Sequence, residues 1–334
     1  MSIAVLKSIE NISNEVVIMT ALKYVRRSSK TKSGKFVAYF SLIFVVFVWG
    51  VSPNLYTLWL KHFSASLIPA VIGLSSGIAL LIFSAKHLRE LNKKYFLLAI
   101  PTGIFNGLAS ILQKIGLQYT TPSQYAFLEN LSCVVVPFLM FLFVRKKPNA
   151  GKIIACLLCL AGAFVLNFDG GVLSFGIGDI LCAMAGILYG VNIALTGAFA
   201  KQLNAALYVM IQMFTTSAIS FATAFTLNAI TVNGAPIEPL RFSFNPLIIL
   251  LLIAFGLLSN AFCWIVRTNA MKKVDATVVA VIMPFSAVVT AVISVIKGAD
   301  PLTNNLIIGG FLSLCAAILS GFSDGVTLSK IHHK

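Results

Sequence analysis

Trp49-Gly50-Val51 is the stretch of this chain that decides its fold, because it occurs twice. The second copy, Tyr189-Gly190-Val191, lies 140 positions further on. Each copy is followed by nine residues and then by a lysine, Lys61 in the first case and Lys201 in the second. Long self-similarity of this kind indicates a duplicated chain.

The duplication continues beyond these copies at a different spacing. Asn106 matches Asn260, and Gln113-Lys114-x-Gly116-Leu117 matches Arg267-Thr268-x-Ala270-Met271, both at an offset of 154. The change of 14 positions falls in one polar insertion around 228–245. A single change of loop length between two matching patterns is what a duplication predicts.

The composition indicates a membrane protein. Of the 334 residues, 58% are hydrophobic and 10% are charged, whereas about a quarter are charged in soluble domains. The apolar runs are continuous and about 20 residues long, which suits helices that cross the hydrocarbon core rather than strands. Ten such runs are expected: 36–60, 64–85, 95–118, 122–144, 150–168, 178–200, 204–227, 246–268, 276–297 and 303–326.

The net charge of +15 follows the membrane topology. Of the 25 Lys and Arg residues, 21 lie in ends and loops on one side of the predicted spans and 3 on the other, with Lys114 inside a span. Because basic loops stay in the cytoplasm, both termini are expected inside, after ten crossings. No nucleic-acid-binding motif accompanies the basic residues, so a nucleic-acid partner is not expected.

The odd number of spans in each half decides the architecture. Five crossings per half place the second half in the membrane upside down relative to the first. The fold class expected is an all-α polytopic membrane protein of ten transmembrane helices, arranged as two inverted five-helix repeats. In such designs the solute site lies near the midplane, between the repeats.

The remaining parts of the chain add little chemistry. Residues 1–35 form a basic segment, read either as a helix on the anionic inner leaflet or as a cytoplasmic tail. Residues 327–334 are expected to be a cytoplasmic tail. All six cysteines lie in apolar segments and are expected to pack there, so no disulfide framework is expected. His332 and His333 do not make a metal site, and no metal or other cofactor is expected.

The ordered motifs resemble those of the drug/metabolite transporter superfamily, specifically its EamA-type ten-helix transporters. The resemblance covers roughly 36–326 and rests on Trp49-Gly50, Phe127-Leu128-Glu129-Asn130, Val135-Val136-Pro137-Phe138 and Val281-Ile282-Met283-Pro284-Phe285. It implies a first repeat at 36–168, a second at 178–326, and a central cavity lined by segments 1, 3, 4, 6, 8 and 9. Family members often carry a glutamate just after segments 4 and 9, where this chain has Lys146 and Asp300.

Glu129 is the leading site candidate, since it is the only acid placed well inside an apolar segment. A charge there costs about 3 kcal/mol or more and indicates a function. Its expected partner is Lys114, on the preceding span. Glu129 either binds a substrate amine or exchanges a proton, or else forms a standing ion pair with Lys114 that only locks two helices together.

The other candidates are polar or aromatic residues at mid-span. Asn106 and Asn260 occupy equivalent positions and could both reach one solute, or could serve only as hydrogen bonds between helices. Trp49 and Tyr189 could stack on a planar or cationic solute, or could simply pack. Further lining candidates are Tyr56, Gln113, Tyr125, Asn192, Trp264 and Arg267. Lys114 and Arg267 would suit an anionic cargo if both point inward.

These observations favour an alternating-access secondary transporter, driven by a gradient or by exchange, for small polar metabolites such as amino acids or their derivatives. The alternative within this class is an exchanger of nucleotide-like or cofactor-like metabolites. An integral-membrane enzyme is less favoured, because the histidines do not cluster with acids. A channel is less favoured because alternating access already explains a doubled inverted frame. The expected setting is the inner (plasma) membrane of a bacterium, with proton coupling left open and a monomeric or homodimeric protein.

Overall fold

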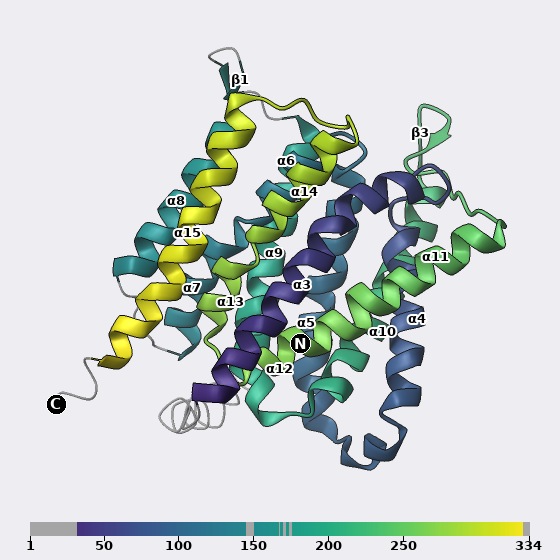
Figure 1. Ribbon diagram of the computed structural model, residues 1–334. Helices are drawn as coiled ribbons and strands as arrows, with labels where there is room; N and C mark the ends of the chain where they lie inside the picture. The colour runs from purple at the N-terminus through teal and green to yellow at the C-terminus, as the bar shows by residue number, and fades with distance from the viewer. Residues whose placement is uncertain (1–31, 145–149, 167, 170–171, 174–175, 330–334) are drawn as a thin grey trace, which may run out of the picture.

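The computed structural model describes residues 32–144, 150–166, 168–169, 172–173 and 176–329 and is mostly helical (Figure 1). The expected N-terminal segment up to residue 31, Lys146, and the end of the C-terminal tail from residue 330 lie outside the described residues. The longer helices of the first half are α3 (Lys32–Trp59), α4 (Leu67–Phe83), α5 (Lys93–Gly116), α6 (Pro122–Glu129), α7 (Ser132–Val144) and α8 (Ala150–Leu166). Those of the second half are α9 (Ile177–Phe199), α10 (Ala205–Ala229), α11 (Pro246–Gly256), α12 (Cys263–Met271), α13 (Ala276–Ile282), α14 (Phe285–Ile296) and α15 (Asn304–Ser329).

Short elements complete the described chain. Two 3-10 helices, η2 (Ala85–Glu90) and η3 (Ala200–Gln202), lie in connections, and the π-helix η4 (Leu257–Phe262) joins α11 to α12. The strands β1 (Phe168–Asp169) and β2 (Val172–Leu173) form one antiparallel hairpin, and β3 (Thr231–Val232) and β4 (Ala235–Pro236) form another. Both hairpins lie at the same end of the helical bundle (Figure 1).

Seven helical stretches of the described chain are long and apolar enough to cross a membrane. They are Phe36–Trp59, Lys93–Gly116, Pro122–Leu142, Ile177–Gln202, Ala205–Ala229, Pro246–Met271 and Ala276–Ile296, and three shorter apolar helices are Leu67–Phe83, Ile153–Gly162 and Asn304–Ala316. Large apolar side chains are exposed on the outside of these helices, including Phe40, Phe83 and Phe138. Such a surface suits a lipid environment, so the chain is a polytopic membrane protein.

Three of the spans are interrupted. The fourth breaks at Asn130–Leu131, between α6 and α7, and the ninth at Met283–Pro284, between α13 and α14. Pro137 lies inside α7, away from the break in the fourth span. Pro284 does lie at its break, where its missing N–H removes a helical hydrogen bond. The eighth span contains η4, whose wider turns free backbone carbonyls for other contacts.

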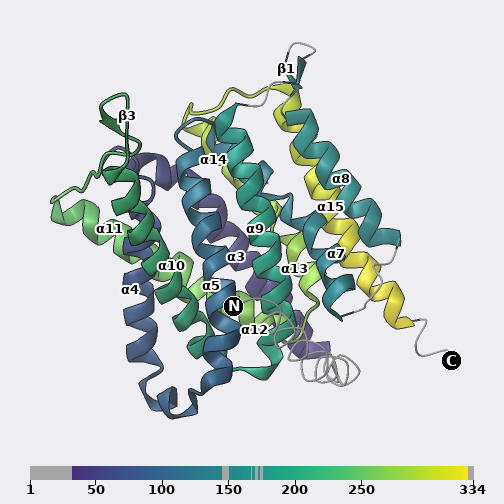
Figure 2. The same ribbon diagram turned by 180° about the vertical axis from the view of Figure 1, so that it is seen from behind.

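The helices of the two halves pack in matching pairs (Figures 1 and 2). α4 lies along α10 and α8 along α15, and these helices are counterparts at the offsets of 140 and 154. α5 packs on α9, while its counterpart α12 packs on α3, the counterpart of α9. Exchanging the two halves therefore reproduces the same set of neighbours.

Two glycines make matching close contacts in the two halves. A Cβ added to Gly50 in α3 would come within 2.5 Å of Val289 Cβ and 2.9 Å of the Ser286 carbonyl oxygen in α14. A Cβ added to Gly190 in α9 would come within 2.8 Å of Val135 Cβ in α7. Gly50 and Gly190 differ by 140 positions and Val135 and Val289 by 154, which are the offsets of the duplication.

Carboxylates fasten the two halves together at the end of the bundle that carries the hairpins. Glu238, after β4, accepts hydrogen bonds from the backbone N–H and hydroxyl of Ser66, the residue before α4. Asp300, between α14 and α15, accepts from the backbone N–H and hydroxyl of Ser123 in the first turn of α6. All four residues are buried. A carboxylate at a helix N-terminus is stabilised by the orphan N–H groups and the helix dipole.

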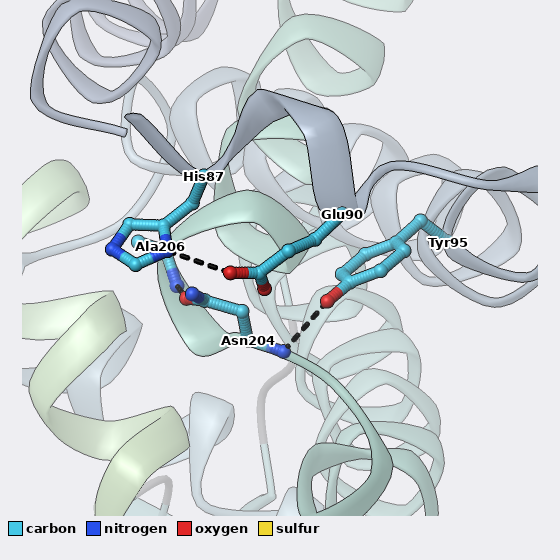
Figure 3. A network of polar contacts seen from close by, with 5 residues as sticks. All are labelled: His87, Glu90, Tyr95, Asn204 and Ala206. Atoms are coloured by element: carbon cyan, nitrogen blue, oxygen red, sulfur yellow. Dashed lines mark hydrogen bonds and ion pairs between the residues drawn. The ribbon is translucent and has the colours of Figure 1, made fainter. Parts of the chain in front are cut away.

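Weaker contacts join the halves at the opposite end (Figure 3). The Tyr95 hydroxyl, in the first turn of α5, accepts from the backbone N–H of Asn204 at 3.0 Å, and Asn204 caps α10 by accepting from Ala206 N–H. His87 and Glu90 in η2 pair nearby at 2.7 Å, but both are exposed. Exposed pairs of this kind contribute about 0–1 kcal/mol.

Candidate functional site: a charged cavity between the two halves

A cavity lies inside the helical bundle and is lined from both halves of the chain. Including the part open to solvent, about 890 Å³ of space within it is not filled by atoms. Its lining comes from six of the expected spans, the first, third, fourth, sixth, eighth and ninth, with Pro69 and Ile72 added by the second. These are the spans that the family resemblance implied, apart from the contribution of the second.

The structure brings eleven of the twelve expected site residues to this cavity. They are Trp49, Tyr56, Asn106, Gln113, Lys114, Tyr125, Glu129, Tyr189, Asn260, Trp264 and Arg267. Asn192 is fully buried behind the wall, where its amide nitrogen donates to the Thr102 carbonyl at 2.9 Å. Asn192 therefore acts on the cavity through Arg267, whose Nη2 donates to its amide oxygen at 2.9 Å.

One side of the cavity holds a chain of charged and polar groups. Gln113 Nε2 donates to Glu129 Oε2 at 2.7 Å, and Lys114 Nζ donates to Gln113 Oε1 at 3.0 Å. Lys114 Nζ also donates to the Tyr125 hydroxyl at 3.2 Å and lies 4.0 Å from the centre of the Tyr56 ring. The ammonium group is thus satisfied by an amide, a phenol and a ring face.

The standing ion pair that the sequence left open between Glu129 and Lys114 is not formed. No salt bridge within 4.0 Å joins them, and the Gln113 amide lies between the two cavity charges instead. An amide can accept from an ammonium group and donate to a carboxylate at once, so it joins both charges without bringing them into contact. Glu129 is also only half-buried, so its carboxylate faces the cavity.

Tyr189 extends this polar chain into the sixth span. Its hydroxyl donates to Gln113 Oε1 at 3.1 Å and lies 2.9 Å from the Ser110 hydroxyl. Two donors therefore share one amide oxygen, which fixes the orientation of the Gln113 side chain. That orientation leaves Gln113 Nε2 directed at Glu129.

The other side of the cavity is aromatic and cationic. The rings of Trp49 and Trp264 lie 5.9 Å apart, and the guanidinium carbon of Arg267 lies 3.8 Å from the centre of the Trp264 ring and 5.5 Å from that of Trp49. Trp49 Nε1 donates to the carbonyl oxygen of Ser259 at 3.0 Å, an oxygen within η4. The π-helix therefore helps hold the indole in place.

The two matched asparagines differ in their surroundings. Asn106 is buried, and its Nδ2 donates to the Thr216 hydroxyl at 2.9 Å, while its Oδ1 has no partner among the described residues. Asn260 lies in η4 and lines the cavity while only half-buried. The Asn106 amide thus joins two helices through its Nδ2, while its Oδ1 remains an unused acceptor in the described chain.

Several lining residues were not expected from the sequence. Met283 and Thr290 line the ninth-span side, as does Ser286, and Ser132 lines the fourth-span side. The duplication could have found Met283, because it is the counterpart of the candidate Glu129 at the offset of 154. Small hydroxyl residues in an apolar span give little other signal.

No group of three His, Cys, Asp or Glu side chains that could hold a metal ion occurs among the residues described here. The Cys156 thiol donates to the carbonyl of Cys133 at 3.1 Å, and Cys133 belongs to a buried cluster with Ala155, Cys159 and Ala316.

The family model called EamA-like transporter family matches residues 36–168 and 176–322, which is most of the chain. The chain belongs to the EamA-like transporter family.

The chain is also similar to a curated protein and to a solved structure. A protein of Archaeoglobus fulgidus described as an uncharacterized transporter is 24% identical over 217 residues, which cover 65% of this chain. The match spans just under two thirds of that protein's length, 66%. A solved structure described as the crystal structure of a protein has a TM-score of 0.65 at 15% identity, covering 87% of this chain and 97% of the other, which shows the fold alone.

Membership in the family and the apolar helices together show a multi-pass integral membrane protein. The drug/metabolite transporter resemblance read from its motifs is therefore confirmed.

Proposed function

We propose that this EamA-family protein is an alternating-access secondary transporter built from ten membrane crossings. In this proposal residues 36–168 and 178–326 are two five-helix repeats of opposite orientation, both chain ends lie in the cytoplasm, and the cavity is the solute chamber. The observation that carries the proposal is a charged cavity lined by both halves inside an apolar helical bundle. Solute sites between inverted repeats have this placement.

The packing supports the inverted arrangement. α4 and α10 lie against each other, as do α8 and α15, which is expected of counterpart helices beside a two-fold axis. The contacts of Gly50 with Val289 and of Gly190 with Val135 repeat each other across the halves. α3 begins and α15 ends at the same end of the bundle, as an even number of crossings requires (Figure 1).

The lining favours a small polar metabolite, and an amino acid or its derivative above others. Glu129 offers a carboxylate to an amine, while Lys114 and Arg267 offer cations to an acid group. A solute that carries both charges could satisfy both sides of the cavity at once. Intramembrane charges are expensive to maintain and are found where they handle substrates or protons. Glu129 is also our candidate for coupling transport to protons.

Counterflow into vesicles of purified protein tests this proposal. Proteoliposomes loaded with unlabelled amino acids should accumulate the matching labelled amino acid with saturable kinetics, and protein-free vesicles should not. Flux that rises in proportion to concentration without saturation would indicate a channel. No amino-acid counterflow would remove the favoured substrate class.

A second candidate is an exchanger of nucleotide-like or cofactor-like metabolites. Trp49 and Trp264 favour it, since their paired rings beside a guanidinium could stack on a planar base. Counterflow of labelled AMP with no counterflow of amino acids would select this alternative.

A further inference from the structure

Arg267 is a buried cation for which no carboxylate partner is found. Its side chain is 1% exposed, and no acidic group lies within 4.0 Å of it in the described chain. Its Nη2 bonds to the neutral amide of Asn192, and its Nε has no acceptor among the described residues. A buried guanidinium without a carboxylate costs several kcal/mol unless other groups compensate.

The groups around Arg267 compensate it only in part. Trp264 and Trp49 present ring faces, and Asn192 presents one oxygen. The carboxylate of Glu129 lies more than 4.0 Å from Arg267 and is already bonded to Gln113. Arg267 lines the cavity and keeps an Nε donor without an acceptor in the described chain. Guanidinium groups bind oxygen anions with two donors, so this side chain is suited to one.

The duplication shows where such an anion would lie. Arg267 is the counterpart of Gln113, and Met283 is the counterpart of Glu129, both at the offset of 154. In the first half, Gln113 Nε2 donates to the Glu129 carboxylate at 2.7 Å. In the second half the donor at this position has become the cation Arg267, while the carboxylate has become the thioether of Met283, which also lines the cavity.

The two helix breaks support this correspondence independently. The fourth span breaks at Asn130–Leu131, and the ninth breaks at Met283–Pro284, one residue before the position that the offset of 154 gives. Glu129 is the last residue of α6, and Met283 directly follows the last residue of α13. The second half therefore has a charged donor, Arg267, where the first half has Gln113, but it has no carboxylate at Met283, the counterpart of Glu129.

We propose that Arg267, Trp49, Trp264 and Met283 form an anion subsite that binds a carboxylate of the transported solute. The solute's carboxylate accepts hydrogen bonds from Arg267, as the Glu129 carboxylate accepts one from Gln113 in the first half. This inference rests on the proposed function, since it assigns one end of the solute to one side of the cavity. It requires the cargo to be an acid or a zwitterion.

The test uses two probe mixtures that differ only in the acid group. One contains L-amino acids with short 2-oxo and dicarboxylic acids, and the other contains the corresponding primary amides. The measurement is the thermal midpoint of purified protein in detergent, because a ligand that binds the folded state raises it. The acid mixture should raise the midpoint of the wild-type protein, and the amide mixture should not.

Arg267→Gln should weaken binding of the acid mixture about 10- to 100-fold, which is the effect of losing hydrogen bonds to a charged group. Arg267→Lys should recover part of that loss, because it restores the charge without the two-donor geometry. Equal shifts from acids and amides, no shift from acids, or an unchanged acid response in Arg267→Gln would overturn the inference. Stabilisation by inorganic phosphate but not by the acids would overturn it too.

Met283→Glu keeps the inference testable even if Arg267 variants do not fold. The new carboxylate should pair with Arg267, raise the thermal midpoint without any probe, and abolish the response to the acid mixture. Met283→Gln is the matched neutral control and should lose less of that response. Equal responses in the two variants would contradict the subsite.

Failure of this subsite can be told apart from failure of the transport proposal. Saturable counterflow of a neutral or cationic solute would leave transport standing and remove the anion subsite. A carboxylate that binds through Arg267 without any counterflow would leave the subsite standing and remove transport.

Discussion

At the scale of single residues, Gln113 decides how the cavity charges are arranged. It accepts from Lys114 and Tyr189 and donates to Glu129, so it holds a cation and a carboxylate apart while satisfying both. In a direct ion pair with Lys114, the Glu129 carboxylate would be less available to bind a solute. The bridged arrangement leaves part of its half-buried carboxylate facing the cavity.

Glu129→Gln should lower the initial rate of counterflow at least about tenfold, since one lost charge-assisted hydrogen bond has about that effect. The amide still accepts a hydrogen bond from Gln113, so protein yield and thermal midpoint should stay close to wild type. If Glu129 carries the coupled proton, the pH dependence of the remaining rate should flatten. Wild-type rates with an unchanged pH profile would remove Glu129 from the mechanism.

The sequence revealed which residues belong to the cavity better than it revealed their partners. Charged and amide groups inside apolar runs are costly, so Glu129, Lys114 and Arg267 could be found without a structure. Their pairing depends on side-chain directions around a helix, and the adjacent positions 113 and 114 left the choice open. Asn192 was assigned to the cavity wall for the same reason, although it lies behind the wall.

At the scale of helices, close approach at glycine holds the central spans together. α3 and α14 meet at Gly50, where an added Cβ would lie 2.5 Å from Val289 Cβ. Small residues let membrane helices approach closely and gain dispersion contacts. Gly190 repeats this contact in the other half, where α9 meets α7. Both helix contacts therefore require a residue without a Cβ.

Gly50→Ala should destabilise the folded protein by about 1–3 kcal/mol, the usual effect of overpacking a close contact. Gly310→Ala is the matched control, because nothing lies within 4 Å of a Cβ there. Its gain in helix propensity should be about 0.5–1 kcal/mol. Thermal midpoints in one detergent compare the two variants, and Gly50→Ala at or above Gly310→Ala would contradict the packing argument.

Helices were easier to predict than their interruptions. The apolar runs predict helical spans because the bilayer requires backbone groups to pair within each segment. The break at Asn130–Leu131 and the π-helix Leu257–Phe262 contain no proline. The local sequence therefore does not predict either interruption. Both border the cavity, where polar neighbours can satisfy the freed backbone groups.

At the scale of the whole molecule, the two ends of the bundle are fastened differently. Glu238 and Asp300 from the second half each bind a backbone N–H and a hydroxyl at a helix start of the first half. At the opposite end Tyr95 and Asn204 make a neutral contact between the halves (Figure 3). Alternating access would require the carboxylate contacts to break whenever the cavity opens toward the hairpin end.

Glu238→Gln combined with Asp300→Asn should therefore loosen that end selectively. Each change keeps an acceptor oxygen but removes the charge from a helix N-terminus, a loss of about 0.5–1 kcal/mol per site. Amide hydrogen exchange should speed up a few-fold at residues 66–70 and 123–127, while residues 205–209 at the other end keep their wild-type rate. Uniform acceleration across the protein would mean that the carboxylates stabilise the fold as a whole rather than fasten one end. Unchanged exchange at 66–70 and 123–127 would mean that the hydroxyl and amide contacts suffice without the charge.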